Sequence, residues 1–105
     1  MKLRIKGNTL RYRLTRTDVD NLSGEGYLEE QTDFPGNPFI YAVQLTDGQS
    51  LTASYIDNKI TVSMSRNMIG ELTDTNRVGF SNNDGQLHLL IESPNIIFLR
   101  YNLKI

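Results

Sequence analysis

The sequence contains no cysteine and a single histidine, His88. Without cysteine the chain forms no disulfide, offers no thiolate nucleophile and holds no cysteine-based zinc or iron–sulfur centre. A catalytic histidine needs a nucleophile or a carboxylate within reach, and the pattern around His88 offers no organised candidate, so we interpret it as a sheet or surface residue. We therefore expect no metal, no cofactor and no catalytic residue, and the sequence argues against an enzyme without excluding one.

Long apolar segments are also missing. No apolar run approaches the ~18 residues that a membrane-spanning helix needs. Charged residues recur at every second position from Lys2 to Lys6, which excludes the apolar core of a secretory signal there. The 105 residues suffice for one hydrophobic core but not for two. We expect a single domain over residues 1–105, located in the cytoplasm and without membrane contact.

The charges are unevenly distributed, although the net charge is only −1. Residues 17–60 carry eight acidic side chains and one lysine, whereas residues 61–105 carry four basic and four acidic side chains. Residues 1–16 carry no acidic side chain and six basic ones, which are Lys2, Arg4, Lys6, Arg11, Arg13 and Arg16. A basic block followed directly by an acidic block requires a physical explanation.

The basic block has the pattern of a β-hairpin. Charged and apolar residues alternate over 2–6 and again over 9–14, and Gly7-Asn8 between them suits a two-residue turn. This turn pairs Arg4 with Arg11 and Lys2 with Arg13. One face of the hairpin then carries Leu3, Ile5, Leu10 and Tyr12. The other face, called the basic face below, carries Lys2, Arg4, Arg11 and Arg13.

The rest of the chain alternates in short runs separated by turn residues. Further strands are predicted over 27–34, 39–45, 51–56, 60–64, 78–81, 86–92 and 96–105. Short helices are predicted after Thr15 and after Ser65, each of which can cap a helix. The pattern predicts a mainly β, α+β fold. About eight short antiparallel strands form a compact barrel or a two-sheet arrangement with two short helices.

No internal repeat or linker is apparent in the sequence. The segment 96–105 keeps its apolar alternation to the last residue, with Leu103 and Ile105 on one face. A strand with this many apolar residues is either central in a sheet or covered by a partner. The segment 96–105 is therefore predicted either to be a central strand or to contact a protein partner or a second copy of the chain in a homodimer.

The opening Lys2-Leu3-Arg4-Ile5-Lys6-Gly7-Asn8-Thr9-Leu10-Arg11-Tyr12-Arg13-Leu14-Thr15 resembles the start of a family of small, uncharacterised bacterial proteins. Three further stretches, Gly26 to Glu30, Val78 to Phe80 and Leu87 to Leu90, fit the same pattern. The family has no assigned activity, so the resemblance implies relatives and supplies no catalytic residue.

The basic face has two interpretations. Like charges opposite each other on paired strands are destabilising unless an anion lies on them, so the face is a candidate site for phosphate, nucleic acid or an acidic partner. Alternatively, the chain neutralises itself through Glu29, Glu30 and Asp33, or through Asp18 and Asp20. Nucleic acid is the weaker choice among external ligands, because the alternation turns Tyr12 away from the basic face and leaves no base-stacking pattern.

The function predicted from the sequence is a non-enzymatic binding or protein-interaction module that uses Lys2, Arg4, Arg11 and Arg13. Two alternatives remain open at this point. One is a small enzyme or enzyme accessory with an unrecognised site, and the other is a self-associating structural protein.

Overall fold

A computed structural model describes residues 1–73 and 77–94. The predicted strand 96–105, and with it the predicted homodimer contact, lies outside the described residues. In chain order the elements are β1 (Lys2–Lys6), β2 (Thr9–Arg13), α1 (Arg16–Glu25), β3 (Tyr27–Asp33), β4 (Pro38–Thr46), β5 (Thr52–Ile56), β6 (Lys59–Ser65), α2 (Arg66–Leu72), β7 (Gly79–Asp84) and β8 (Leu87–Glu92).

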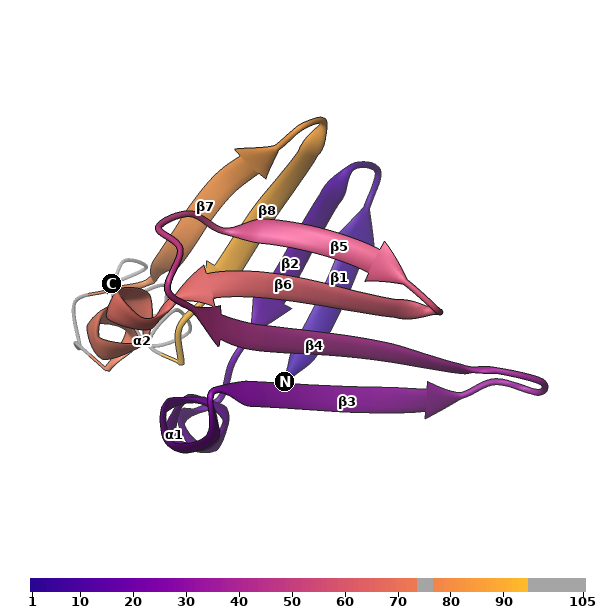
Figure 1. The fold of residues 1–105 in the computed structure, drawn as a ribbon, viewed down its shortest axis with the longest axis horizontal. Coiled ribbons are helices and arrows are strands. Elements are labelled where there is room, and N and C mark those ends of the chain that lie inside the picture. The colour runs from indigo at the N-terminus through magenta and orange to yellow at the C-terminus, as the bar shows by residue number, and fades with distance from the viewer. Residues whose placement is uncertain (74–76, 95–105) are drawn as a thin grey trace, which may run out of the picture.

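The strands form two four-stranded sheets, called sheet A (order β1-β2-β8-β7) and sheet B (order β3-β4-β6-β5). Sheet B lies across sheet A, and both helices lie at the end where β2, β4, β6 and β8 finish (Figure 1). The mainly β, α+β class is confirmed, and of the two predicted arrangements the two-sheet one is correct. The expectation of antiparallel strands is wrong for the centre of each sheet, because β2 pairs with β8 in parallel and β4 pairs with β6 in parallel.

The N-terminal hairpin has the register that its alternation predicts. Arg4 faces Arg11 and Lys2 faces Arg13, and the pair Lys6–Thr9 closes the turn. Gly7 has a φ of 52°, as the first central residue of a tight hairpin turn requires.

Both helices begin at the predicted caps. The Thr15 hydroxyl accepts the backbone N–H of Asp18 at 3.0 Å, and the Asp18 carboxylate accepts the Thr15 N–H at 2.8 Å, which is a complete capping box. The Ser65 hydroxyl accepts the N–H of Asn67 at 3.1 Å. Gly26 ends α1 in the left-handed conformation, with a φ of 75°.

The core lies between the inner faces of the two sheets and under both helices. Tyr12 is fully buried there and meets Tyr41 edge to face, with ring centroids 6.3 Å apart, so β2 of sheet A contacts β4 of sheet B directly. Each helix contributes two buried aliphatic side chains to this core, Val19 and Leu22 from α1 and Ile69 and Leu72 from α2.

The two halves of the chain repeat one another, contrary to the sequence analysis. Residues 1–46 and 51–92 both run hairpin–helix–hairpin, and exchanging the halves turns the strand order of sheet A into that of sheet B. Residue n of the first hairpin matches n + 50, because Lys2↔Arg13 corresponds to Thr52↔Ser63. In the second hairpin of each half, the pair Tyr27↔Gln44 corresponds to Gly79↔Glu92. A residue n of β3 therefore matches residue n + 52 of β7, and a residue n of β4 matches residue n + 48 of β8.

Hydrogen bonds outside the ladders obey the same correspondence. The N–H of His88 donates to the carbonyl of Asn8 at 2.8 Å, and the equivalent Ile40 donates to Asn58 at 3.0 Å. Between residues 2–23 and 52–73 the identical pairs are Asn8/Asn58, Arg16/Arg66 and Leu22/Leu72. So few identities leave the repeat visible in the structure and obscure in the sequence.

Candidate functional site

The basic face lies on the outer side of sheet A, over its strands β1 and β2. Because β1 and β2 alternate, Lys2, Arg4, Arg11 and Arg13 all turn away from the core, and Lys6 joins them on the same side. The four predicted side chains are therefore together, and the structure adds a fifth cation to them.

Glu92 of β8 provides the only negative charge that pairs with this face in the described part of the chain. Its carboxylate lies 2.9 Å from the Nε of Arg11 and 3.3 Å from an Nη of Arg13. The parallel pairing of β2 with β8 places Glu92 directly beside Arg13. The Glu92 side chain is only 8% exposed, so one nearly buried carboxylate binds two guanidinium groups.

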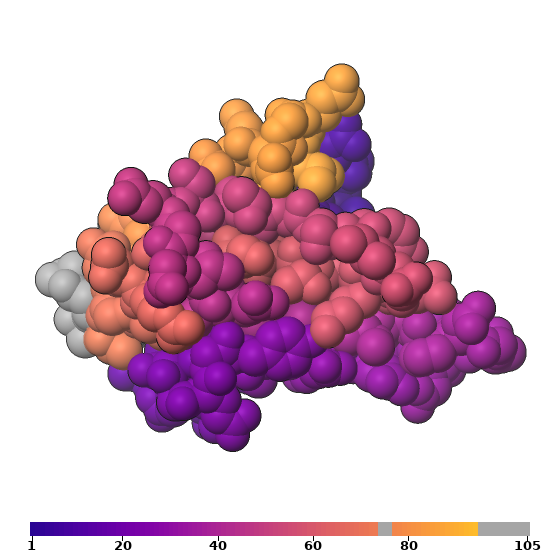
Figure 2. All heavy atoms as spheres, in the orientation of Figure 1, coloured from indigo at the N-terminus to yellow at the C-terminus, as the bar shows by residue number. Residues whose placement is uncertain are grey.

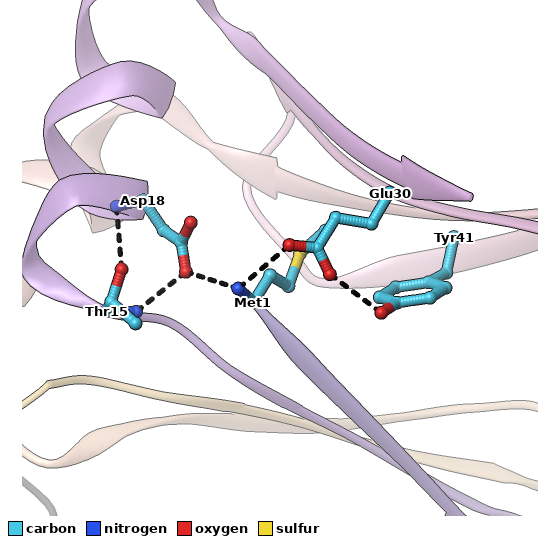
Figure 3. A network of polar contacts seen from close by, with 5 residues as sticks. All are labelled: Met1, Thr15, Asp18, Glu30 and Tyr41. Carbon is cyan, nitrogen blue, oxygen red and sulfur yellow. Dashed lines mark hydrogen bonds and ion pairs between the residues drawn. The ribbon is translucent and has the colours of Figure 1, made fainter. Parts of the chain in front are cut away.

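None of the five carboxylates expected to neutralise the basic face forms an ion pair with it among the described residues, and three of them bind other cations. Asp18 and Glu30 both pair with the Met1 ammonium, at 2.8 and 3.2 Å (Figure 3). Glu29 lies 3.9 Å from the Nζ of Lys59. The self-neutralising interpretation thus named the wrong carboxylates, because sequence proximity does not reveal which strand lies beside β2.

The Met1 cluster shifts the pKa of three groups, which are the Met1 ammonium, Asp18 and Tyr41. Burial opposes the charge on Asp18, but its hydrogen bonds to the Met1 ammonium and to Thr15 outweigh burial and lower its pKa below 3.8. Burial would also lower the pKa of the Met1 ammonium, and the bonds to Asp18 and Glu30 raise it above 8.0 instead. The Tyr41 hydroxyl donates to Glu30 at 2.7 Å, and this bond raises the pKa of Tyr41 to about 12.

Three cations of the basic face are left without a carboxylate. No ion pair among residues 1–73 and 77–94 includes Lys2, Arg4 or Lys6. A hollow of about 230 Å³ is lined by Arg4, Lys6, Thr9 and Arg11. A smaller hollow of about 80 Å³ is lined by Lys2, Arg4, Arg11 and Arg13. Both are open surface depressions that only polar or charged residues line.

A protein-family profile, described as a family of unknown function (DUF7009), matches residues 1–94. The chain belongs to this family. The resemblance to an uncharacterised family that the opening motif indicates is thereby confirmed, and the match covers every described element from β1 to β8. No curated protein and no solved structure matches the chain. Membership of DUF7009 consequently brings no catalytic or binding residue with it, and the function of the chain has to be argued from its own surface.

His88 takes the sheet and surface position predicted for it. His88 is exposed on the outer side of sheet A, beside Thr9, and its Nδ1 lies 2.7 Å from the Asn83 side-chain oxygen. Glu29 and Glu30 turn to opposite faces of β3, where they bind Lys59 and Met1 respectively. In residues 1–73 and 77–94 there is no cluster of three potential metal-ligating side chains and no helix of the length and hydropathy that crossing a membrane requires.

The repeat provides an internal control for the basic face. The positions of the second hairpin that match Lys2, Arg4, Arg11 and Arg13 are Thr52, Ser54, Thr61 and Ser63. Sequence reasoning missed this comparison because it missed the repeat. The same hairpin in the same fold is therefore built with small hydroxyl side chains where the first hairpin has four cations.

Proposed function

We propose that this chain is a non-enzymatic protein-interaction module whose basic face binds an acidic segment of a partner protein. The comparison of the two hairpins carries the proposal. Since Thr52, Ser54, Thr61 and Ser63 satisfy the fold at the equivalent positions, folding does not require four cations there. Cross-strand cations cost stability, so their presence on one hairpin alone points to a role outside the fold.

Incomplete neutralisation supports the same proposal. Five cations share the outer side of β1 and β2, and Glu92 binds only Arg11 and Arg13. Lys2, Arg4 and Lys6 remain available to an incoming carboxylate, which they can attract over roughly 10 Å at moderate ionic strength.

An acidic protein fits this face better than a nucleic acid does. The described outer positions of sheet A carry no phenylalanine, tyrosine or tryptophan ring on which a base could stack, and the imidazole of His88 there contacts Asn83. The chain as a whole has a net charge of −1, so a long polyanion would meet repulsion beyond the basic face. We place the interaction in the cytoplasm, as the sequence analysis predicts.

The test is a binding titration with an acidic peptide, acetyl-hexaglutamate amide, at low and moderate salt. The double variant Arg4→Ala/Arg11→Ala should weaken binding by about tenfold or more, because each charge-assisted contact contributes on the order of 1–3 kcal/mol. The affinity of the unmodified protein should fall as salt rises.

A matched control removes two cations from outside the basic face. Arg16 and Arg66 are exposed, equivalent residues that begin α1 and α2. The variant Arg16→Ala/Arg66→Ala has the same net charge as the test variant and should bind within about twofold of the unmodified protein. Equal losses in both variants, or binding that is insensitive to salt, would contradict the proposal.

A further inference from the structure

The strand β1 has an outer edge, called the free edge below, with which no described strand pairs. It is the outermost strand of sheet A, and four of its five residues are exposed. In the β1–β2 register, the pair Lys6–Thr9 closes a two-residue turn, so Lys2, Arg4 and Lys6 are the hydrogen-bonded positions of the ladder. The backbone N–H and C=O groups of Leu3 and Ile5 therefore point away from β2, toward the free edge.

In the equivalent strand β5, a side chain occupies part of the edge. The N–H of Ala53, which matches that of Leu3, donates to the Asp84 carboxylate at 2.9 Å. Thr32 takes the place of Asp84 in the first half. In the described part of the chain no hydrogen bond joins Thr32 to Leu3, so β1 lacks the side chain that occupies the edge of β5.

An apolar groove lies on the core side of β1. It encloses about 340 Å³ between the diverging ends of the two sheets, and Ile5, Leu10, Phe39, Tyr55, Ile60 and Leu87 are among its lining residues. Figure 2 shows this divergence, with the orange β7–β8 hairpin and the indigo tip of the β1–β2 hairpin projecting away from the pink strands of sheet B. Ile5 is 54% exposed and Tyr55 is 65% exposed, so the groove leaves large apolar side chains in contact with solvent.

The two sides of the free edge thus have opposite chemistry. Lys2, Arg4 and Lys6 project to the basic face, while Leu3 and Ile5 between them project to the groove side. A strand added at this edge would alternate in the same way, with one set of side chains over the cations and the other set toward the groove.

We propose that β1 recognises its partner by strand addition, and that the partner is an extended protein segment in which acidic and apolar residues alternate. This inference rests on the proposed function, since it uses the same cations. Charge complementarity selects the occupant: a second copy of β1 would bring lysines and arginines against Lys2, Arg4 and Lys6, and like charges at an edge repel.

The test compares two peptides of one composition on the full-length protein. The first is acetyl-Glu-Val-Glu-Val-Glu amide and the second is acetyl-Glu-Glu-Glu-Val-Val amide. Amide hydrogen exchange measured by NMR should show the Leu3 and Ile5 amides exchanging freely without peptide and protected with the alternating one. The Arg4 amide, which already bonds to β2, should change little. The alternating peptide should also bind about fivefold more tightly than the permuted one.

The outcomes separate the two proposals. Equal binding of both peptides without protection of Leu3 and Ile5 overturns strand addition and leaves the basic face as a binding surface. Failure of both peptides to bind overturns both proposals. Protection of the two amides before any peptide is added also overturns the inference, and its dependence on protein concentration then distinguishes a second copy from another segment of this chain.

A pair of variants isolates the backbone contribution. Ile5→Ala and Ile5→Pro both shorten the apolar side chain, but only proline removes the outward N–H, and an edge strand tolerates proline at such a position. Strand addition predicts that Ile5→Pro binds the alternating peptide about fivefold more weakly than Ile5→Ala. Equal affinities of two variants with the same thermal midpoint would contradict it.

Discussion

Glu30 of β3 and Asn82 of β7 occupy equivalent positions in the two halves, and each binds the residue that precedes a hairpin. Glu30 accepts from the Met1 ammonium at 3.2 Å, whereas Asn82 donates its amide to the Leu51 carbonyl at 2.8 Å. The two sheets are thus joined at equivalent positions. The carboxylate of Glu30 binds a cation at one position, and the amide of Asn82 binds a carbonyl oxygen at the other. The same geometry is kept with different chemistry.

The first prediction concerns Asn82. We expect Asn82→Ala to lower the free energy of unfolding by about 1 kcal/mol, because it removes one partly buried hydrogen bond between the sheets. Urea unfolding would measure this loss. The neighbouring Asn83→Ala, which removes a contact with the exposed His88, should cost less than about 0.5 kcal/mol and serves as the control.

The second prediction concerns the pH dependence of the Met1–Asp18 pair. The folded-state pKa of Asp18 is lowered, so its contribution to stability is present above pH 3.8 and is lost as the pH falls through the folded value. The pKa of the Met1 ammonium is raised, so its contribution is present below pH 8.0 and is lost as the pH rises through the folded value. Asp18→Asn should lower the free energy of unfolding at neutral pH. It should also reduce the loss of stability at low pH and the loss of stability at high pH.

Urea unfolding over a series of pH values measures this effect, with Asp20→Asn as the control because Asp20 is exposed and takes part in no ion pair among the described residues. A profile of Asp18→Asn that runs parallel to that of the unmodified protein would show that Asp18 and Met1 do not interact in solution.

The third prediction uses Tyr41 as a reporter. Its pKa of about 12 results first from the hydrogen bond to Glu30 and then from burial. Glu30→Gln replaces the carboxylate by a neutral amide, so the phenol should ionise at a lower pH in an ultraviolet titration. Tyr41→Phe identifies which step of the titration belongs to Tyr41. An unchanged titration in Glu30→Gln would mean that the bond to Glu30 is absent.

The fourth prediction separates stability from binding at Glu92. Glu92→Gln should lower the free energy of unfolding by about 1–3 kcal/mol, since Arg11 and Arg13 lose their charged acceptor. The same change should strengthen binding of acetyl-hexaglutamate amide, because the basic face then has one negative charge fewer. Weaker peptide binding in a folded Glu92→Gln protein would place the anion away from Arg11 and Arg13.

The fifth prediction concerns Gly79, the first residue of β7. Its φ is 156°, and a Cβ added there would collide with the carbonyl oxygen of Ile91. Gly79→Ala should therefore destabilise the protein by about 2 kcal/mol or more. Gly70→Ala is the control: Gly70 lies within α2 with open space around it, and the change should stabilise by about 0.5–1 kcal/mol. Similar thermal midpoints for the two variants would contradict this account.

Local features of the fold could be predicted from the sequence, because their causes are local. Alternation and the Gly7 turn determine the β1–β2 register, and Thr15 with Asp18 determines the start of α1. The parallel pairing of β2 with β8 could not be predicted, because 79 residues separate Arg13 from its partner Glu92 and nothing in either strand alone selects the other.

The same long-range pairing limited the prediction of the site. The basic face itself follows from the period of two, and the structure brings its four predicted residues together. The predicted basic face lacks Lys6, although Lys6 shares the alternation of Arg4 and the same signal applies to it. Glu92 was beyond reach, because only the position of β8 makes it a neighbour of Arg11.

The repeated architecture has a consequence for how such a surface can arise. In a symmetric dimer of two identical hairpin–helix–hairpin chains, one substitution changes both hairpins at once, so four cations on one hairpin would be eight on the assembly. In a single chain that contains both halves, a substitution changes one hairpin only. The first hairpin can accumulate charge while its counterpart at Thr52 to Ser63 stays neutral at the matching positions and continues to serve the fold. Covalent joining of the halves thereby lets the surface of one hairpin change while the other hairpin keeps its role in the fold.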